Sequence, residues 1–105
     1  GKLIIDHGMD DPLIPVEGTI NYYNRMRDIC GGQTATDQFC RLYINPGDGH
    51  GNCFTNGPGL TESTGIRALI NWVENEVAPE DLPTIQVNKK TGETINTGFT
   101  TPWRK

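Results

Sequence analysis

Apolar residues recur in two patterns along the first thirty positions, a short continuous run and a stripe spaced by threes and fours. Residues Lys2 to Ile5 form a run too short for a helix, and Asp6-His7-Gly8 follows with loop-forming residues, which predicts a short buried strand. From Glu17 the spacing predicts a helix that stops at Gly31-Gly32. The side chains of its apolar stripe, expected to face a core, are Ile20, Tyr23, Met26, Ile29 and Cys30.

The same two patterns return in the middle of the chain. The stretch from Phe39 to Ile44 is rich in β-forming residues and stops at Asn45-Pro46-Gly47, which predicts a second strand after a polar connection. Between Thr61 and Val77 the apolar spacing predicts a helix ended by Ala78-Pro79. Its expected core-facing residues are Ile66, Leu69, Ile70, Val73 and Val77.

The order strand, helix, strand, helix predicts parallel strands joined by a right-handed crossover, and so an α/β fold. We expect residues 1–83 to form this unit. Residues 84–105 are expected to form a tail with a hairpin, whose strands Thr84 to Val87 and Glu93 to Thr97 flank Lys89-Lys90-Thr91-Gly92. Because two strands do not make a stable parallel sheet, and Gly1 enters directly at a strand, we expect an incomplete domain, the C-terminal piece of a larger one.

Composition narrows the classes of partner. The chain has 105 residues, a formal net charge of −4 and a pI near 5.0, which suits one small domain or a piece of one. It lacks the basic patch that phosphate-backbone binding needs, so we expect no nucleic-acid partner. The longest apolar run, Leu3-Ile4-Ile5, is far shorter than a membrane-spanning helix requires, and we expect no membrane partner.

Three cysteines, Cys30, Cys40 and Cys53, are too few for a disulfide scaffold and lack the spacing of a zinc site. An odd number leaves at least one unpaired within the chain. It indicates either a reducing compartment or a bridge to a cysteine outside these residues, and the number alone does not choose between them.

Both predicted strands are followed by loops with reactive side chains. The first loop offers the carboxylates Asp6, Asp10 and Asp11, and the second places His50 among glycines. Because parallel strands end at the same edge of a sheet, a carboxylate and an imidazole can meet there. Such a pair suits nucleophilic acyl transfer, with acid before histidine as in α/β-hydrolases. The single serine, Ser63, is not in a nucleophile elbow, so a nucleophile would have to come from elsewhere.

Other interpretations stay open on the residues alone. The loop aspartates can be simple turn formers and His50 an exposed ring, which would make the chain a non-catalytic binding or structural module. The same carboxylates and imidazoles offer ligands for a divalent metal, as in a metal-dependent hydrolase, although no known metal-binding spacing is present. We expect His7 to bond the backbone of its own loop, and Trp72 and Trp103 to pack rather than stack on a ligand.

Three segments together resemble the tannase and feruloyl esterase family, which has the α/β-hydrolase fold. The first resembles the family's acid-bearing segment, the second its histidine segment and the third its last helix, and the likeness covers residues 1 to about 83. The segments are Gly1 to Pro15 with Gly18-Thr19-Ile20 and Tyr22-Tyr23, then Arg41 to His50, and finally Ala68 to Glu74 with Val77-Ala78-Pro79.

The resemblance implies roles for particular residues. It makes Asp11, which directly precedes the run Pro12 to Pro15, the triad acid, and His50 the general base. It also implies a serine nucleophile and a substrate-covering lid outside this chain, no cofactor, and esters of gallic or hydroxycinnamic acids as substrates. The expected chain is therefore the C-terminal β-α-β-α portion of a serine carboxylic ester hydrolase, with the remainder of the α/β-hydrolase domain as its partner, and is inert by itself.

The resemblance also bears on Cys53. Many family members place a cysteine directly after the catalytic histidine and bridge it to a cysteine beside the serine, whereas Gly51-Asn52 intervene here. A bridge from Cys53 to the absent segment would explain the odd cysteine count and imply a secreted or periplasmic protein. A free thiol in a looser loop is the alternative.

Overall fold

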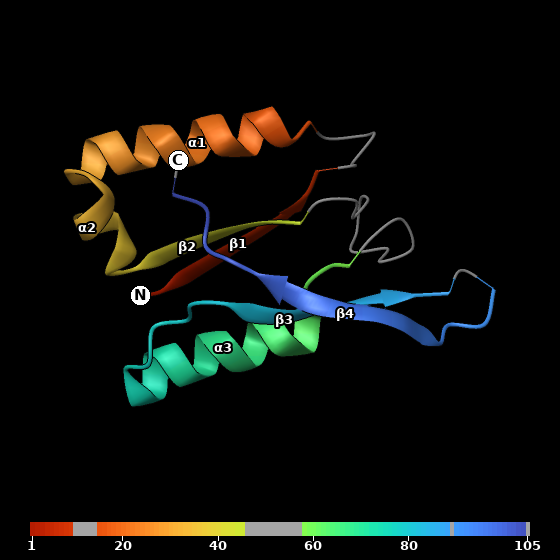
Figure 1. Ribbon diagram of the computed structural model, residues 1–105. Coiled ribbons are helices and arrows are strands. Elements are labelled where there is room, and N and C mark those ends of the chain that lie inside the picture. Colours follow the sequence, from red (N-terminus) through yellow and green to blue (C-terminus); the bar gives the residue numbers. More distant parts are fainter. Residues whose placement is uncertain (10–14, 46–57, 89, 105) are drawn as a thin grey trace.

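The computed structural model describes residues 1–9, 15–45, 58–88 and 90–104, and these alternate strands and helices before a β-hairpin (Figure 1). The predicted mixed α/β class is confirmed. A short helix that the sequence did not predict lies between the first long helix and the second strand. The elements are β1 (Leu3–Gly8), α1 (Val16–Cys30), α2 (Gln33–Asp37), β2 (Cys40–Asn45), α3 (Glu62–Asn75), β3 (Leu82–Val87) and β4 (Thr94–Thr100).

Strands β1 and β2 pair in parallel, with Leu3 opposite Cys40 at one end and Gly8 opposite Asn45 at the other. Figure 1 places α1 on one face of this pair and α3, with the hairpin, on the other. Because side chains alternate between the two faces of a strand, every second residue turns toward α1. The core on that side contains the buried Tyr23, Cys40 and Leu42, with Ile5, Met26, Phe39, Ile44 and Trp103 packed against them.

Helix α1 ends where the glycine pair predicts. Gly31 has a φ of 98°, in the left-handed region that glycine adopts without a Cβ clash, and its N–H and that of Gly32 donate to the last-turn carbonyls of Asp28 and Arg27. Tyr23 is buried as expected. The prediction that Ile29 and Cys30 face the core is wrong, because both are exposed in a last turn that no described element covers.

Helix α3 begins after Thr61, whose hydroxyl accepts a hydrogen bond from the Thr64 N–H at 3.3 Å. The helix ends at Asn75, and Trp72 is buried beneath it. The prediction that its apolar stripe forms core is wrong for the described residues, because a pair of strands is too narrow to cover the helix. Exposed fractions lie between 48% and 58% for Ile66, Ile70, Val73 and Val77.

Strands β3 and β4 pair antiparallel, so the predicted hairpin is present with longer strands than expected. Asn88 Oδ1 accepts from the N–H groups of Lys90 and Thr91, and Gly92 adopts a φ of 76°. The segment after β4 returns to the core, where the Trp103 N–H donates to the Leu42 carbonyl at 2.7 Å. Trp72 and Trp103 thus both pack, as expected. The division at residue 83 stays a prediction.

Candidate active site

The carboxyl ends of β1 and β2 meet at one edge of the sheet. Gly8 lies opposite Asn45, and the Met9 N–H donates to the Asn45 carbonyl at 3.0 Å, so the pairing continues to the end of both strands. In sequence, Asp11 follows the end of β1 and His50 follows the end of β2. Asp11, His50 and Cys53 all lie outside the described residues, so their roles stay predictions.

On the face toward α3, a side-chain hydrogen bond joins the two strands near this edge. Asn45 Nδ2 donates to Asp6 Oδ1. Asp6 is opposite Tyr43 in the register, so Asn45 reaches it diagonally from the same face of the sheet. Asn45 was expected to be a turn residue, but its alternation with Arg41 and Tyr43 in sequence is the signal that places it on this face.

Asn45 is 1% exposed, and among the described residues its Oδ1 has no hydrogen-bond partner. An acceptor left unsatisfied in this way costs about 1–3 kcal/mol. The side chain borders a cavity of about 220 Å³ between the end of β2 and the hairpin, which is large enough for water. The other residues lining that cavity are Pro58, Thr84, Gly98, Phe99 and Thr100.

On the opposite face, His7 connects β1 to α1. Its Nδ1 lies 2.7 Å from Thr19 Oγ1 in the first turn and a half of the helix. The sequence predicted a bond from His7 to the backbone of its own loop, whereas this contact is with a side chain of α1. This contact orients the start of α1 relative to the end of β1, on either side of the segment that holds Asp11.

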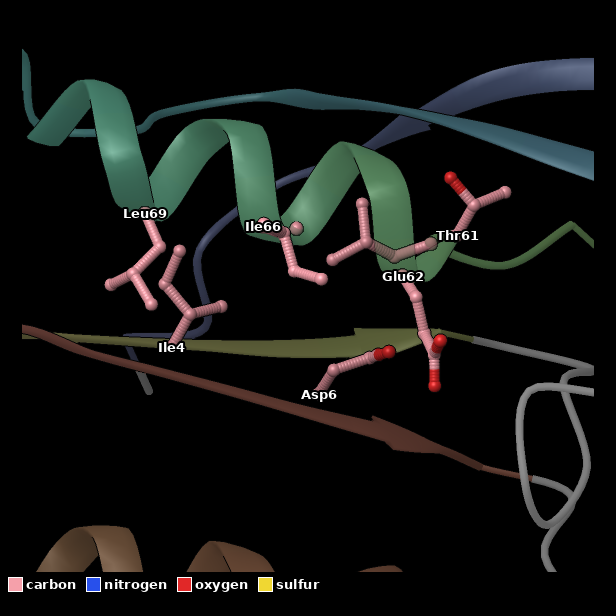
Figure 2. A pocket seen from close by; sticks show the side chains of 8 residues that line it. Ile4, Asp6, Thr61, Glu62, Ile66 and Leu69 are labelled. Atoms are coloured by element: carbon pink, nitrogen blue, oxygen red, sulfur yellow. The ribbon is translucent and has the colours of Figure 1, made fainter.

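A larger cavity, about 400 Å³, lies between β1 and α3. In Figure 2, Ile4 of β1 faces Leu69 and Ile66 of α3, and the carboxylates of Asp6 and Glu62 lie at the other end of the cavity. Its lining is apolar along most of the helix and acidic near the carboxyl edge. The sequence did not single out Glu62, which is the first residue of α3.

Farther from the edge, the α3 face of β2 is held by two buried polar side chains. Arg41 Nε donates to the Pro79 carbonyl at 3.0 Å, and its guanidinium lies 4.9 Å from the Trp72 ring centre. The Tyr43 hydroxyl donates to the Glu80 carbonyl at 2.7 Å, and burial raises the pKa of this phenol. Both side chains thus fix β2 to the connection between α3 and β3.

The described residues offer little nucleophilic chemistry of their own. Burial raises the pKa of the Cys40 thiol to about 11, which keeps it protonated at neutral pH. Ser63 lies in the first turn of α3, with its Oγ 3.3 Å from Thr61 Oγ1, and so belongs to the cap of that helix. A nucleophile for the strand-end edge is therefore not found in this part of the chain.

The same ranges show neither a metal-binding cluster nor a membrane-spanning helix. Within residues 1–9, 15–45, 58–88 and 90–104, no three His, Cys, Asp or Glu side chains gather closely enough to hold a metal ion. In these ranges no helix combines the length and the apolar character needed to cross a bilayer.

Comparisons with known proteins agree with one another. The family model described as "Tannase and feruloyl esterase" matches residues 1–103. The chain is 34% identical over 82 residues to a probable feruloyl esterase of Arthroderma benhamiae and 32% identical over 104 residues to a tannase of Aspergillus oryzae. These alignments cover 78% and 90% of this chain but only 15% and 17% of the relatives.

A solved structure gives the same result. The described fold is similar to that of a tannin acyl hydrolase from Aspergillus niger, with a TM-score of 0.78 and 30% sequence identity. The match covers 98% of this chain and 20% of that one. The chain therefore spans about a fifth or less of the proteins that it resembles.

Proposed function

The chain belongs to the tannase and feruloyl esterase family, and from this we propose that it is the C-terminal part of a serine carboxylic ester hydrolase. The parallel register of β1 and β2 is the observation that carries the proposal. It places the ends of both strands at one edge, with Gly8 three residues before Asp11 on one strand and Asn45 five before His50 on the other. The acid and the base of a triad would then arise from neighbouring strands.

In the proposed mechanism, His50 accepts the proton of a serine hydroxyl as that oxygen attacks the ester carbonyl. Asp11 holds the imidazole in the required tautomer and stabilises the imidazolium that forms. His50 then returns the proton to the leaving alcohol, and a water molecule hydrolyses the acyl-enzyme by the same route. The serine belongs to a part of the protein outside this chain.

The substrate class follows from the relatives. Their names describe one protein as a feruloyl esterase and others as a tannase or tannin acyl hydrolase. We infer that the whole protein hydrolyses esters of phenolic acids, without a cofactor in the chemical step. Secretion, with a disulfide from Cys53 to a cysteine outside this chain, belongs to the same proposal.

The rest of the hydrolase domain is the proposed partner of this chain. The exposed apolar stripe of α3 and the cavity beside β1 form adjoining surfaces that the described residues leave uncovered. The chain is about a fifth or less of its relatives' length, so the remaining polypeptide is long enough to cover them. Accordingly, the 105 residues alone should be inert.

Active-site labelling tests the reaction class. A fluorophosphonate probe should label the full-length protein and abolish its hydrolysis of methyl ferulate, because the probe reacts with activated serines. A chelator should leave turnover unchanged. Loss of activity with chelator and no labelling by the probe would favour a metal-dependent hydrolase instead. A full-length protein that neither labels nor turns over any aryl ester would favour the binding-module interpretation.

A further inference from the structure

The hydrogen bond between Asp6 and Asn45 lies at the one edge of the sheet where the proposed chemistry is assembled. We propose that these two side chains are positioning residues, which fix the end of β2 against the end of β1 so that His50 meets Asp11 in productive geometry. The inference rests on the proposed function and adds to it two residues outside the triad.

The placement of the pair is the first argument. Asp6 and Asn45 are 39 positions apart in sequence, and each lies five positions before the residue it would position. The bond crosses from one strand to the other on the α3 face, beyond the backbone ladder that already joins them. It therefore restrains the two strands diagonally, close to the edge where both leave the sheet.

The neighbours of Asn45 on the same face provide the second argument. Arg41 and Tyr43 donate to backbone carbonyls of the segment after α3, so they hold β2 to that segment and not to β1. Among the described hydrogen bonds of this face, the bond from Asn45 is the one that joins the side chains of the two strands. Positioning β2 relative to β1 is therefore a role that Arg41 and Tyr43 do not share.

The free-energy cost of burying the Asn45 amide provides the third argument. Its Oδ1 is buried and has no partner in the described part of the chain, whereas a leucine, which has the same branched shape, would place no polar atom there. The amide therefore contributes through its donor, which bonds Asp6. A residue chosen only to fill space at this site would not need that donor.

The test uses the full-length protein and three variants. Asn45→Leu removes the donor and keeps the branched shape of the side chain. Asp6→Asn keeps an acceptor at position 6 and serves as the conservative variant. Thr36→Val is the matched control, because it removes the hydrogen bond from the buried Thr36 of α2 to the carbonyl of Gly32, which precedes that helix. The measurements are kcat and KM for methyl ferulate, the pH dependence of kcat/KM, and the melting temperature.

Asn45→Leu should lower kcat about ten- to a hundredfold with little change in KM, because misplacing a catalytic group affects the chemical step. The acid limb of its pH profile should move to lower pH, since an imidazole held away from its carboxylate has a lower pKa. Asp6→Asn should retain most of the wild-type kcat. Thr36→Val should lower the melting temperature while leaving kcat and the pH profile as in the wild type.

The outcomes separate this inference from the function on which it rests. Suppose that His50→Ala abolishes turnover but Asn45→Leu has a normal kcat and pH profile. The positioning role of Asn45 is then overturned, whereas the proposed function stands. A His50→Ala protein of normal turnover overturns both. If Asn45→Leu does not fold, Asn45→Ser removes the amide, keeps a hydroxyl beside the cavity and carries the same expectation. A loss of kcat in Thr36→Val equal to that in the Asn45 variant would also overturn the inference, because it would reveal a general effect of stability.

Discussion

Single side chains on the α3 face of β2 hydrogen-bond to the connection between α3 and β3. Arg41 is 4% exposed, donates to the carbonyls of Pro79 and Asp37, and lies over Trp72. Its charge is balanced by Asp37 and Glu80, whose nearest carboxylate oxygens are 3.7 and 3.6 Å from the guanidinium nitrogens. Removing such a buried cation is costly mainly because the carbonyls and carboxylates that it bonds would be left without a partner.

Replacing Arg41 with methionine should therefore be costly. We expect Arg41→Met to lower the free energy of unfolding of the full-length protein by about 2–4 kcal/mol, because the Pro79 and Asp37 carbonyls lose their buried donor. Arg25→Met, at an exposed position of α1, should change it by less than about 0.5 kcal/mol. Urea denaturation measures both variants, and equal effects would contradict the role given to Arg41.

Secondary-structure elements were predictable where the sequence pattern was local. The first strand and the helix that ends at Gly31-Gly32 were predicted from neighbouring residues, because their signals are periodicity and turn chemistry. The end of that strand was predicted wrongly, because Asp6-His7-Gly8, expected to form a loop, continue β1 in its pairing with β2. Helix α2 was missed because five residues, mostly polar, carry no measurable apolar period. The exposure of the α3 stripe was not predictable, since periodicity shows that a face is apolar but not what covers it.

The uncovered face of α3 leads to a prediction at this scale. If the rest of the domain packs on the stripe, Val73→Asp should destabilise the full-length protein by about 2–4 kcal/mol, because it buries an unpaired charge. Asn71→Asp introduces the same residue two positions away, at an exposed site outside the stripe, and should have little effect. Thermal melting with a circular dichroism readout compares them. Identical melting temperatures would mean that the stripe stays in water in the whole protein.

In the whole molecule, the two faces of the β1–β2 pair differ in the polarity of their side chains. On the α1 face, apolar side chains form a core against which Trp103 packs. On the α3 face, the strands carry the buried polar side chains Arg41 and Asn45, and α3 itself exposes apolar side chains. The sequence predicted the parallel pairing of β1 and β2. The bond from Asn45 to Asp6 could not be predicted, because it requires the strand register, which depends on contacts between residues 39 positions apart.

The central claim at this scale is that His50 is the general base of an ester hydrolase whose serine lies outside the chain. The most direct measurement is kcat for methyl ferulate by the full-length protein before and after His50→Ala. We expect a loss of at least about a thousandfold, with the protein still folded, because removal of one triad member removes the function of the whole triad. Turnover within a few-fold of the wild type would contradict the claim.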